Sequence, residues 1–500
     1  MSKKQENNTP EISTEDEFAI RREKRQNLID NNIDPYPPYY KKDVTLADIK
    51  KKYVNVTKEA PTTDLVTTAG RIIAKRGHGK ASFGNISDET ESMQVYARKD
   101  VIGEEGYAIY ATLDVGDIIG VTGTPFLTNT GELTIKVSEF TLLSKSLNPL
   151  PEKFHGLQDK ELRYRKRYLD LITNPEIKDT FKKRSQVISS IRRYLENEAF
   201  MEVETPVLQP IAGGASAKPF MTHHNALDMK LYLRIALELH LKRLIVGGFE
   251  RVFEIGRVFR NEGVSYKHNP EYTLLELYQA YADYNDMMEL TENLLGTLAK
   301  EITGGHKVQY DNVEINFKPP FARMTMASVI EKYSGIDIYK HDFKSLKKEL
   351  EKISIHVDET YTSKGQLINL VYDKKVEENI IQPTFITDYP LETSPLAKKH
   401  RDNPEIVERF ELVINTMEIA NAFSELNDPV DQKERFEDQL KQREAGDEEA
   451  HMMDDDFIES LEYGMPPTGG LGIGIDRVVM LLTNSQSIRD VLLFPHMKHK

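Results

Sequence analysis

A change of residue pattern near position 148 constrains the fold of this chain more than any other feature. Between residues 65 and 143 the sequence is a series of short β-rich runs, separated by turn signals such as Gly77-His78-Gly79 and Asn129-Thr130-Gly131. Beyond Asn148-Pro149-Leu150-Pro151, long helical patterns mix with strands and show no regular β–α–β repetition. Five hundred residues also exceed what one ordinary core holds, so we expect at least two domains.

The β-rich part predicts five strands, at residues 65–74, 80–87, 92–97, 117–125 and 133–143. Five strands in a segment of this length are typical of a small OB-type barrel. A barrel that binds nothing would show the same periodicity, so the pattern leaves binding open.

The remaining patterns predict an α+β chain with four parts. We expect a tail and helical extension at 1–64, the barrel at 65–148, a linker at 149–175 and a larger α+β domain at 176–500. A stretch rich in lysine and glutamate marks an insertion or lid at about 323–392.

Composition and charge exclude several classes of protein. The chain has no cysteine, which excludes disulfides, thiolate metal sites and a cysteine nucleophile. No apolar run approaches the ~20 residues of a membrane span, and residues 1–17 contain no apolar signal segment, so we expect a cytoplasmic protein. The net charge of −14 argues against indiscriminate binding of nucleic acid, although local basic patches remain.

A strand–loop–strand pattern at 251–281 carries the first group of candidate functional residues. Alternation along 251–262 predicts a strand with Arg260 and Glu262 on one face, and 272–281 predicts the returning strand, with Glu276 and Tyr278 on one face. An arginine fork can hold two phosphate oxygens at once. His268 in the loop can reach a terminal phosphate. An ion pair for Arg260 remains an open alternative.

Tyr272, at the start of the returning strand, can stack on a purine. The alternative is a half-buried strand aromatic, and local evidence does not decide between the two.

The glycine-rich segment from Gly469 to Arg477 carries the second group. Four glycines in six residues predict a strand that another group approaches closely, although tight packing alone remains possible. We expect Asp476 to be the N-cap of a helix at 478–482. Arg477 then lies at a helix start, where backbone N–H groups already favour an anion.

Glu418 and Glu425 form a third, weaker group. An odd spacing on one straight strand places them on opposite faces, so a hairpin or bulge around Asn421-Ala422 is needed to bring them together. Two carboxylates with phosphate oxygens suit Mg²⁺. Two exposed acids would give the same pattern.

The chain lacks the familiar signatures of a side-chain nucleophile with its base, such as Gly-x-Ser-x-Gly. The chemistry indicated is attack of one bound substrate on another, with the protein contributing positioning and charge neutralisation.

Taken together, these motifs resemble those of bacterial-type class II lysyl-tRNA synthetases. Phe259-Arg260-Asn261-Glu262-Gly263 with His268-Asn269-Pro270-Glu271-Tyr272-Thr273 is similar to motif 2, and the segment from Gly470 to Arg477 is similar to motif 3. Residues 192–206 resemble motif 1, the dimer-forming helix and strand. The likeness runs from about residue 18 to the end of the chain.

The resemblance implies an antiparallel sheet flanked by helices, preceded by an OB-fold that binds the anticodon. It also implies ATP-dependent ligation of L-lysine to tRNA(Lys) through a lysyl-adenylate, by a homodimer that uses Mg²⁺.

The resemblance further implies roles for individual residues. Arg260 and Arg477 are the catalytic arginines. The ATP-binding residues are Arg260, Glu262, His268, Tyr272 and Arg477. The lysine-binding residues are Gly214, Glu238, Arg260, Glu276, Tyr278 and Asn427. Glu418 and Glu425 hold Mg²⁺. The anticodon-binding residues are Arg71, Phe83, Gln94 and Glu132.

Physical chemistry supports the placement of Glu276 and Tyr278. The substrate ammonium is charged at neutral pH, since its ordinary pKa is ~10.4, and its burial requires a carboxylate and oriented acceptors. We expect Leu277 to point the other way, into the core. Phe83 in the barrel can stack on a base or belong to the core.

Two positions depart from the family pattern: relatives commonly have glycine at Ala422 and phenylalanine at Tyr272.

Three other interpretations stay open. An aspartyl or asparaginyl relative should present a cation to its substrate side chain, which Glu276 opposes. A ligase that attaches lysine to a protein should lack the barrel. A tRNA-binding module without catalysis should have lost an arginine or a metal carboxylate.

Overall fold

We describe the fold from a computed structural model, which covers residues 14–151, 157–359, 361–444 and 450–498. Most of the expected N-terminal tail, and residues 152–156 of the expected linker, lie outside the described residues. The chain divides into two compact units, Met1–Gln158 and Asp159–Lys500.

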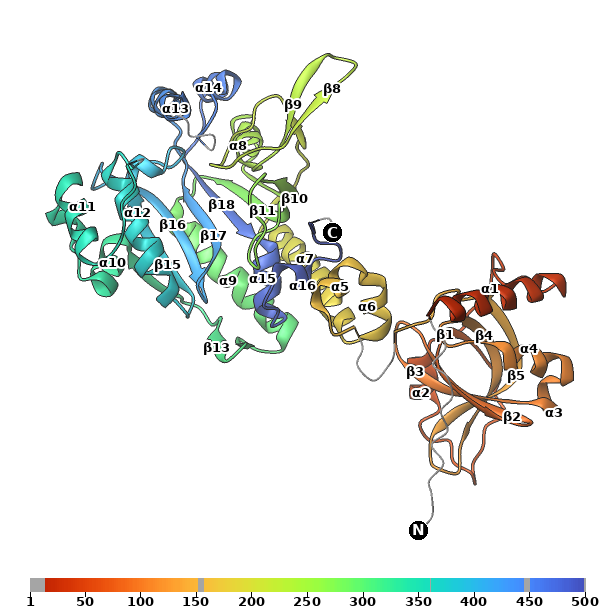
Figure 1. Ribbon diagram of the computed structural model, residues 1–500. Coiled ribbons are helices and arrows are strands. Elements are labelled where there is room, and N and C mark those ends of the chain that lie inside the picture. The colour runs from red at the N-terminus through yellow and green to blue at the C-terminus, as the bar shows by residue number, and fades with distance from the viewer. Residues whose placement is uncertain (1–13, 152–156, 360, 445–449, 499–500) are drawn as a thin grey trace, which may run out of the picture. The chain divides into compact units, whose positions relative to one another are not determined.

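The first unit contains a closed five-stranded barrel with strand order β1-β2-β3-β5-β4 (Figure 1). The strands are β1 (Val66–His78), β2 (Ala81–Ser87), β3 (Ser92–Arg98), β4 (Ile118–Leu127) and β5 (Leu133–Ser144), and the helices are α1 (Thr14–Asp30), α2 (Leu46–Lys52), α3 (Lys99–Ile102) and α4 (Glu104–Thr112). Strand alternation puts residues such as Ile86 and Val95 in the barrel core and leaves their neighbours outside. The OB-fold expected from the five runs is confirmed.

The second unit is built on an eight-stranded sheet, with strand order β14-β15-β16-β17-β18-β11-β10-β6. Its strands are β6 (Met201–Glu202), β10 (Arg251–Phe259), β11 (Glu271–Ala280), β14 (Ala322–Thr325), β15 (Thr384–Pro390), β16 (Ile406–Ile414), β17 (Met417–Ser424) and β18 (Thr468–Gly474). The two outermost pairs, β14–β15 and β10–β6, are parallel and the inner pairs are antiparallel. The sheet is therefore mixed, with the antiparallel centre that was expected.

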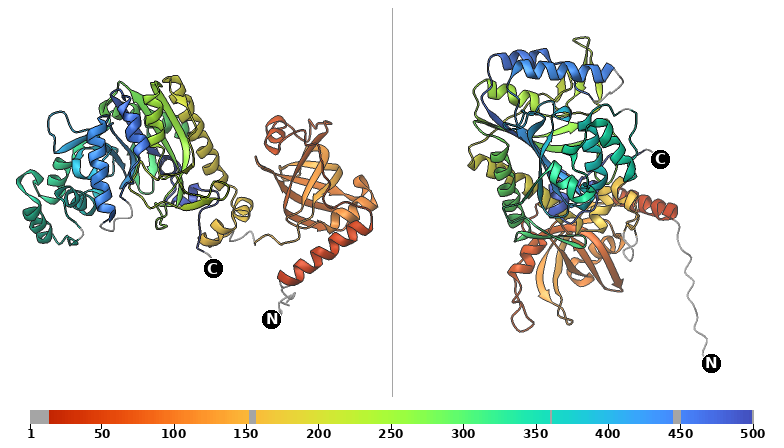
Figure 2. Two further views of the ribbon diagram at one scale, coloured as in Figure 1. Left: turned by 90° about the horizontal axis from the view of Figure 1, so that it is seen from above. Right: turned by 90° about the vertical axis from the view of Figure 1, so that its left-hand side faces the viewer.

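Helices cover both faces of this sheet (Figures 1 and 2). On one face α7 (Ile177–Asn197) and α9 (Tyr284–Thr303) pack side by side, and α15 (Ile475–Leu482) completes the main core. On the other face α8 (Glu238–Val246), α13 (Pro429–Glu444) and α14 (Asp455–Glu462) surround a smaller cluster that includes Tyr278. Leu277 belongs to the first core and Tyr278 to the second, as their alternation along β11 predicts.

Outside the stretch expected as an insertion, the other helices and strands are short. They are α5 (Lys160–Arg165), α6 (Arg167–Thr173), β7 (Leu208–Gln209), β8 (Met221–His224), β9 (Met229–Leu233), β12 (Lys307–Tyr310), β13 (Val313–Asn316) and α16 (Ile488–Val491).

The stretch expected as an insertion begins in β14 and ends just after β15, and both strands belong to the main sheet. Between β14 and β15 lie α10 (Met326–Ser334), α11 (Phe343–Lys352) and α12 (Lys364–Lys375), which share a hydrophobic cluster of their own with β15 and β16.

Three local expectations need correction. The strand expected at 251–262 ends at Phe259, so Arg260 and Glu262 lie in the loop beyond it. The strand that the resemblance to motif 1 implies within residues 192–206 pairs only at Met201–Glu202. Asp476 is not the N-cap of α15: Gly474 takes that position, and the Asp476 carboxylate instead accepts from the Thr273 backbone N–H and pairs with Arg184.

None of the described helices has the length and apolar character that crossing a membrane requires.

Candidate active site

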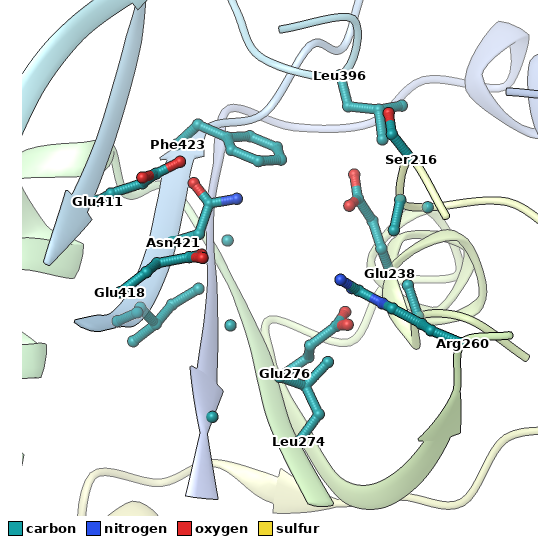
Figure 3. Close-up of a pocket in the computed structure, with 18 of the residues that line it drawn as sticks. Ser216, Glu238, Arg260, Leu274, Glu276, Leu396, Glu411, Glu418, Asn421 and Phe423 are labelled. Carbon is teal, nitrogen blue, oxygen red and sulfur yellow. The ribbon is translucent and has the colours of Figure 1, made fainter. Parts of the chain in front are cut away.

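A pocket opens on the face of the sheet opposite α7 and α9. Figure 3 shows that its side chains come from two sides, with Glu238, Arg260 and Glu276 facing Glu411, Glu418 and Asn421. Strands β11, β18 and β17 form its floor, and the first turn of α8 with the loop after β10 forms one wall.

Glycines of β18 leave space above that floor because they have no side chains. Gly470 lies between Phe423 and Tyr278, and Gly472 lies between Asn421 and Glu276, in register across the three strands. The residues that alternate with them, Leu471 and Ile473, point into the main core. A Cβ at Gly470 would collide with Oε1 of Glu425 and lie 2.6 Å from Cε1 of Tyr278. The close approach predicted for this segment is therefore made by two side chains of the pocket.

At one end of the pocket Glu276 is buried and held in place. Its Oε1 accepts from the Leu237 backbone N–H at 3.0 Å, and its Oε2 accepts from the Tyr278 hydroxyl at 3.2 Å. Burial and the neighbouring Glu238 raise the pKa of Glu276 to about 8. Burial also raises the pKa of Tyr278, which stays a neutral hydroxyl. Among the described residues no cation forms an ion pair with Glu276.

Glu238 and Glu425 complete that end of the pocket, and a buried lysine joins them. The Lys242 ammonium lies 2.6 Å from Oε1 of Glu238 and also pairs with Oε2 of Glu425. Burial raises the pKa of both carboxyls, and Lys242 opposes that rise. We call Glu238, Glu276, Tyr278 and Glu425 the acidic end of the pocket.

Gly214 lies against this group with a backbone that suits glycine. Its φ is +85°, and a Cβ there would lie 3.0 Å from Cβ of Ala236 and 3.1 Å from Cβ of Glu238. The backbone of Gly214 can therefore approach a ligand beside Glu238.

The other predicted residues of motifs 2 and 3 also line the pocket. Arg260 lies over the Tyr272 ring, with its guanidinium carbon 5.4 Å from the ring centroid. Nε2 of His268 lies 3.3 Å from Nη2 of Arg477. Burial and Arg477 lower the pKa of His268, so the imidazole is neutral at neutral pH. Glu262 lies exposed in the same lining.

A β-bulge brings Glu418 and Glu425 to the same side of the sheet. Leu412 pairs with Ala420 and Val413 pairs with Glu418, which leaves Ile419 as the extra residue of β17. The odd spacing is thereby corrected, although the bulge lies nearer Glu418 than Asn421-Ala422 and no hairpin interrupts β17 there. Both carboxylates line the pocket, but Glu425 is engaged by Lys242, whereas Glu418 is about half exposed.

Glu411 on the neighbouring strand faces Glu418. Burial and the charge of Glu418 raise the pKa of Glu411 to about 7, although Arg409 pairs with it at 2.7 Å. Arg477 lies 3.6 Å from Oε2 of Glu418. Within the described residues, no cluster of three or more metal-ligating side chains forms a ready metal site.

Asn427 is the predicted lysine-site residue that the structure leaves outside the pocket lining. It follows the end of β17, and its side chain accepts from Lys398 at 2.6 Å and donates to the Met465 carbonyl at 3.0 Å.

On the barrel, three of the four predicted anticodon residues share one surface. Phe83 is 38% exposed and stacks on Tyr96 of β3, with ring centroids 4.3 Å apart. Gln94, two residues before Tyr96 on the same strand, donates to Glu132 at 2.9 Å. Arg71 lies elsewhere: it is half-buried and donates to the Gly116 carbonyl at 2.7 Å. The residue of β1 that pairs with Phe83 is instead Arg76.

Four of these residues escaped the sequence analysis. Lys242 stands one helical turn after Glu238, a spacing that signals an ion pair but not that both groups are buried. Arg76 and Tyr96 were hidden because strand pairing, which sequence periodicity does not give, places them beside Phe83. Glu411 carried no signal of its own.

Comparison with known proteins agrees with this geometry. A family described as tRNA synthetases class II (D, K and N) matches residues 159–498, and an OB-fold nucleic acid binding domain matches residues 66–143. The chain is 55% identical over 488 residues to a lysine–tRNA ligase of Bacillus cereus (strain G9842), covering 97% of this chain and 98% of the relative. It is 56% identical over 500 residues to a lysine–tRNA ligase of Thermoanaerobacter sp. (strain X514), covering 99% of this chain and 98% of the relative.

The chain belongs to the class II lysine–tRNA ligase family.

A third relative, the lysine–tRNA ligase of Halalkalibacterium halodurans, is 55% identical over 496 residues, or 98% of each chain. The class II match covers the whole unit that holds the pocket, and the OB-fold match covers the barrel. Membership in the class II lysine–tRNA ligases therefore confirms the resemblance drawn from the motifs, and it places the protein among ATP-dependent ligases.

Proposed function

We propose that the pocket activates L-lysine with ATP and that the enzyme then transfers the lysyl group to tRNA(Lys). The observation that carries the proposal is the acidic end of the pocket, where the buried Glu276 and Tyr278 have no paired cation among the residues that the structure describes. A buried carboxylate is costly unless a cation pairs with it, and the ε-ammonium of lysine supplies that cation.

The same observation argues against the related substrates. An aspartate side chain would bring only acceptors to a wall of acceptors, and an asparagine amide would bring no positive charge to pair with Glu276. Glu238 and the backbone of Gly214 are proposed to hold the α-amino group, and Arg260 the carboxylate. Asn427 is proposed to act only through its loop, because its amide is engaged by Lys398 and Met465.

ATP is proposed to occupy the opposite part of the pocket. Tyr272 offers its ring to the adenine and Glu262 its carboxylate to the adenine edge. Arg477 and His268, which lie together, suit the outer phosphates. Arg260 suits the α-phosphate because it lies over the Tyr272 ring and near Glu276 of the acidic end.

The reaction follows from these positions. A lysine carboxylate oxygen attacks the α-phosphorus in line, forming a phosphorus–oxygen bond as the bond to pyrophosphate breaks. Arg260 and Arg477 stabilise the charge that develops on the phosphate oxygens. A ribose hydroxyl at the 3′ end of tRNA then attacks the adenylate carbonyl carbon, and AMP leaves. The hydroxyl proton passes to a base that we do not assign to a side chain.

Mg²⁺ is proposed as the metal, and the two predicted ligands fit it unequally. Glu418 fits, because its carboxylate is about half exposed in the pocket and faces Glu411. Glu425 does not fit in this arrangement, because it is fully buried and paired with Lys242. Mg²⁺ takes one or two carboxylates together with phosphate oxygens, and it would neutralise phosphate charge there.

The barrel is proposed to bind the anticodon. Phe83 and Tyr96 form a stacked platform, Phe126 extends it with a centroid 6.0 Å from Tyr96, and Gln94 and Glu132 offer hydrogen-bonding groups beside it. Arg76 is the proposed cation of this surface in place of Arg71. The presence of the barrel disfavours a ligase that acts on a protein, and the retained arginines disfavour a module without catalysis.

We further propose a homodimer in the cytoplasm. The short β6 forms an open edge of the sheet and exposes Met201, and the chain that follows it exposes two more apolar side chains, Val207 and Leu208. An unpaired edge with apolar neighbours suits coverage by a second copy. The absence of cysteine suits a reducing compartment.

The first prediction tests the function itself. Pyrophosphate exchange with each of the twenty amino acids should be supported by lysine far above the others. Glu276→Gln should raise the KM for lysine by about 30-fold or more, since removing one partner of a buried charge pair costs ~2–5 kcal/mol. The KM for ATP should stay within about threefold. Equal effects on both substrates would remove Glu276 from the lysine site.

The second prediction concerns pH. Lysine binding requires an ionised Glu276, and a pKa of about 8 leaves most of this carboxyl protonated at pH 6. Lysine affinity should therefore rise with pH between 6 and 8, by up to about tenfold per unit, and level off above 8. Calorimetry in buffers of different ionisation enthalpy should show proton release at pH 7. Glu276→Gln should remove this part of the dependence; an unchanged profile in that variant would contradict it.

The third prediction distinguishes the role of Glu418, on β17, from that of Glu425, just after this strand. Glu418→Gln should raise the Mg²⁺ concentration needed for pyrophosphate exchange by about tenfold, with lysine binding in the absence of ATP unchanged. Glu425→Gln should leave the Mg²⁺ requirement unchanged and weaken lysine binding measured without ATP or Mg²⁺. If both variants change only the Mg²⁺ requirement, Glu425 is a metal ligand and does not belong to the lysine site.

The fourth prediction concerns the barrel. Phe83→Ala should raise the KM for tRNA by about fivefold to 150-fold, because base stacking contributes ~1–3 kcal/mol, while lysine-dependent pyrophosphate exchange stays within about twofold. Tyr39→Ala is the matched control: Tyr39 is an exposed aromatic beside Tyr40, which packs on Gly120 of β4. Loss of exchange in Phe83→Ala would refute the separation of roles.

A further inference from the structure

Lys242 is a buried cation for which neither the motifs nor the reaction has a role. Its side chain is 0% exposed, and its ammonium lies between Glu238 on its own helix and Glu425 beyond the end of β17. It also lies 5.6 Å from the ring centroid of Phe423 and 5.7 Å from that of Phe457. A lysine is rarely buried to this extent unless paired groups require it.

Packing alone does not explain this position. An i,i+4 pair stabilises a helix by only ~0.2–0.5 kcal/mol when it is exposed, and burying the same ion pair is often no better than burying apolar groups. A buried pair is better explained where it fixes the geometry of groups with another task. Glu238 is proposed to bind the α-amino group, and Glu425 lies near Tyr278 at the acidic end of the pocket.

The charges at this end lead to a simple count over the described residues. Glu238, Glu276 and Glu425 bring three carboxylates, and Lys242 and Arg260 bring two cations. Arg409 is already matched by Glu411, and His451, which lies near Lys242, is neutral because burial lowers its pKa to about 4. One positive charge is missing, and that is the net charge of lysine, with its two ammonium groups and one carboxylate.

We propose that Lys242 is a positioning residue of the lysine site, which fixes Glu238 and Glu425 and sets the charge of the cleft so that one further positive charge completes it. This inference rests on the proposed lysine site and adds a residue that touches no substrate. Without Lys242 the cleft would lack two positive charges, and Glu238 and Glu425 would lose the ammonium that fixes their carboxylates. The pKa of Glu238, which Lys242 lowers, would also rise.

The groups that face Lys242 define what a pH test must include. Glu238 lies on its own helix, Glu425 follows β17, and His451 precedes α14. Glu276 and Tyr278 of β11 act on the same two carboxyls, as does Arg409 of β16 on Glu238. Burial raises the pKa of all three carboxyls, that of Glu276 to about 8, so the test follows Glu238, Glu276 and Glu425 together.

The experiment measures equilibrium binding of L-lysine to the full-length enzyme without ATP or Mg²⁺, from pH 6 to 8.5. The variants are Lys242→Met, Glu425→Gln and the double variant, because methionine keeps most of the apolar stem of lysine. Lys242→Met should weaken binding at pH 7 by about 30-fold or more and steepen its dependence on pH. Calorimetry should show more protons released per lysine bound than in the wild type.

The sign of the Glu425→Gln effect decides the question. In the wild-type chain this change should weaken lysine binding, and in the Lys242→Met chain it should strengthen binding by about tenfold, because it removes the acid that lost its partner. Additive losses would reduce Lys242 to a packing role and overturn the proposal. If Lys242→Met does not fold, the double variant is compared with Glu425→Gln: affinities within about threefold support the proposal, and a larger loss overturns it.

Two further variants keep the interpretations apart. Arg243→Met removes the next cation on α8, which pairs with Asp454 at 2.9 Å instead of with the pocket, and should change lysine affinity by less than about twofold. Glu276→Gln tests the proposed site in the same assay. If Glu276→Gln binds lysine normally, the lysine site itself is misplaced. If it binds weakly while Lys242→Met binds normally, only the role of Lys242 falls.

Discussion

The burial of three carboxylates in one cleft is the constraint on which the site depends. Glu238, Glu276 and Glu425 are each nearly inaccessible to solvent, and burial of a carboxylate is tolerated only with a partner cation or a bound proton. Lys242 satisfies two of them in part, and Glu276 accepts from a backbone N–H and a tyrosine hydroxyl. These buried acids are the reason why we assign this end of the pocket to a cationic ligand.

The sheet makes such a cleft possible because its central strand β18 has different residues on its two faces. β18 places glycines on the pocket face and Leu471 and Ile473 on the core face, so the fold is stabilised from one side while the other stays open. Its neighbours supply Tyr278 and Phe423 on either side of Gly470. A side chain at this glycine would fill the space between Glu425 and Tyr278, so the stability of the core and the shape of the site are set by alternate residues of one strand.

Much of the fold was predictable from local sequence, and the site less so. The five barrel strands and the opposite orientations of Leu277 and Tyr278 follow from a two-residue period, which is a local property. The correct partner of Phe83 does not: Arg71 and Arg76 lie on the same strand, and only the register of β1 against β2 shows that Arg76 lies opposite Phe83. Likewise Asp476 has the residue type of an N-cap, yet tertiary contacts with Thr273 and Arg184 take its carboxylate, and the cap moves to Gly474.

The pair Glu418 and Glu425 shows why the rest of the site could not be predicted from the sequence. Their spacing required an irregularity in β17, and the bulge at Ile419 provides it, but spacing could not reveal that a lysine from another element reaches one of the two carboxylates. Once Lys242 engages Glu425, the two acids have different environments: Glu418 is half exposed beside Arg477, and Glu425 is buried beside Tyr278. Chemically identical side chains thus acquire different surroundings from their counter-charges, and in the proposed site the cation supplied by α8 distinguishes the acid assigned to a metal from the acid assigned to an amine.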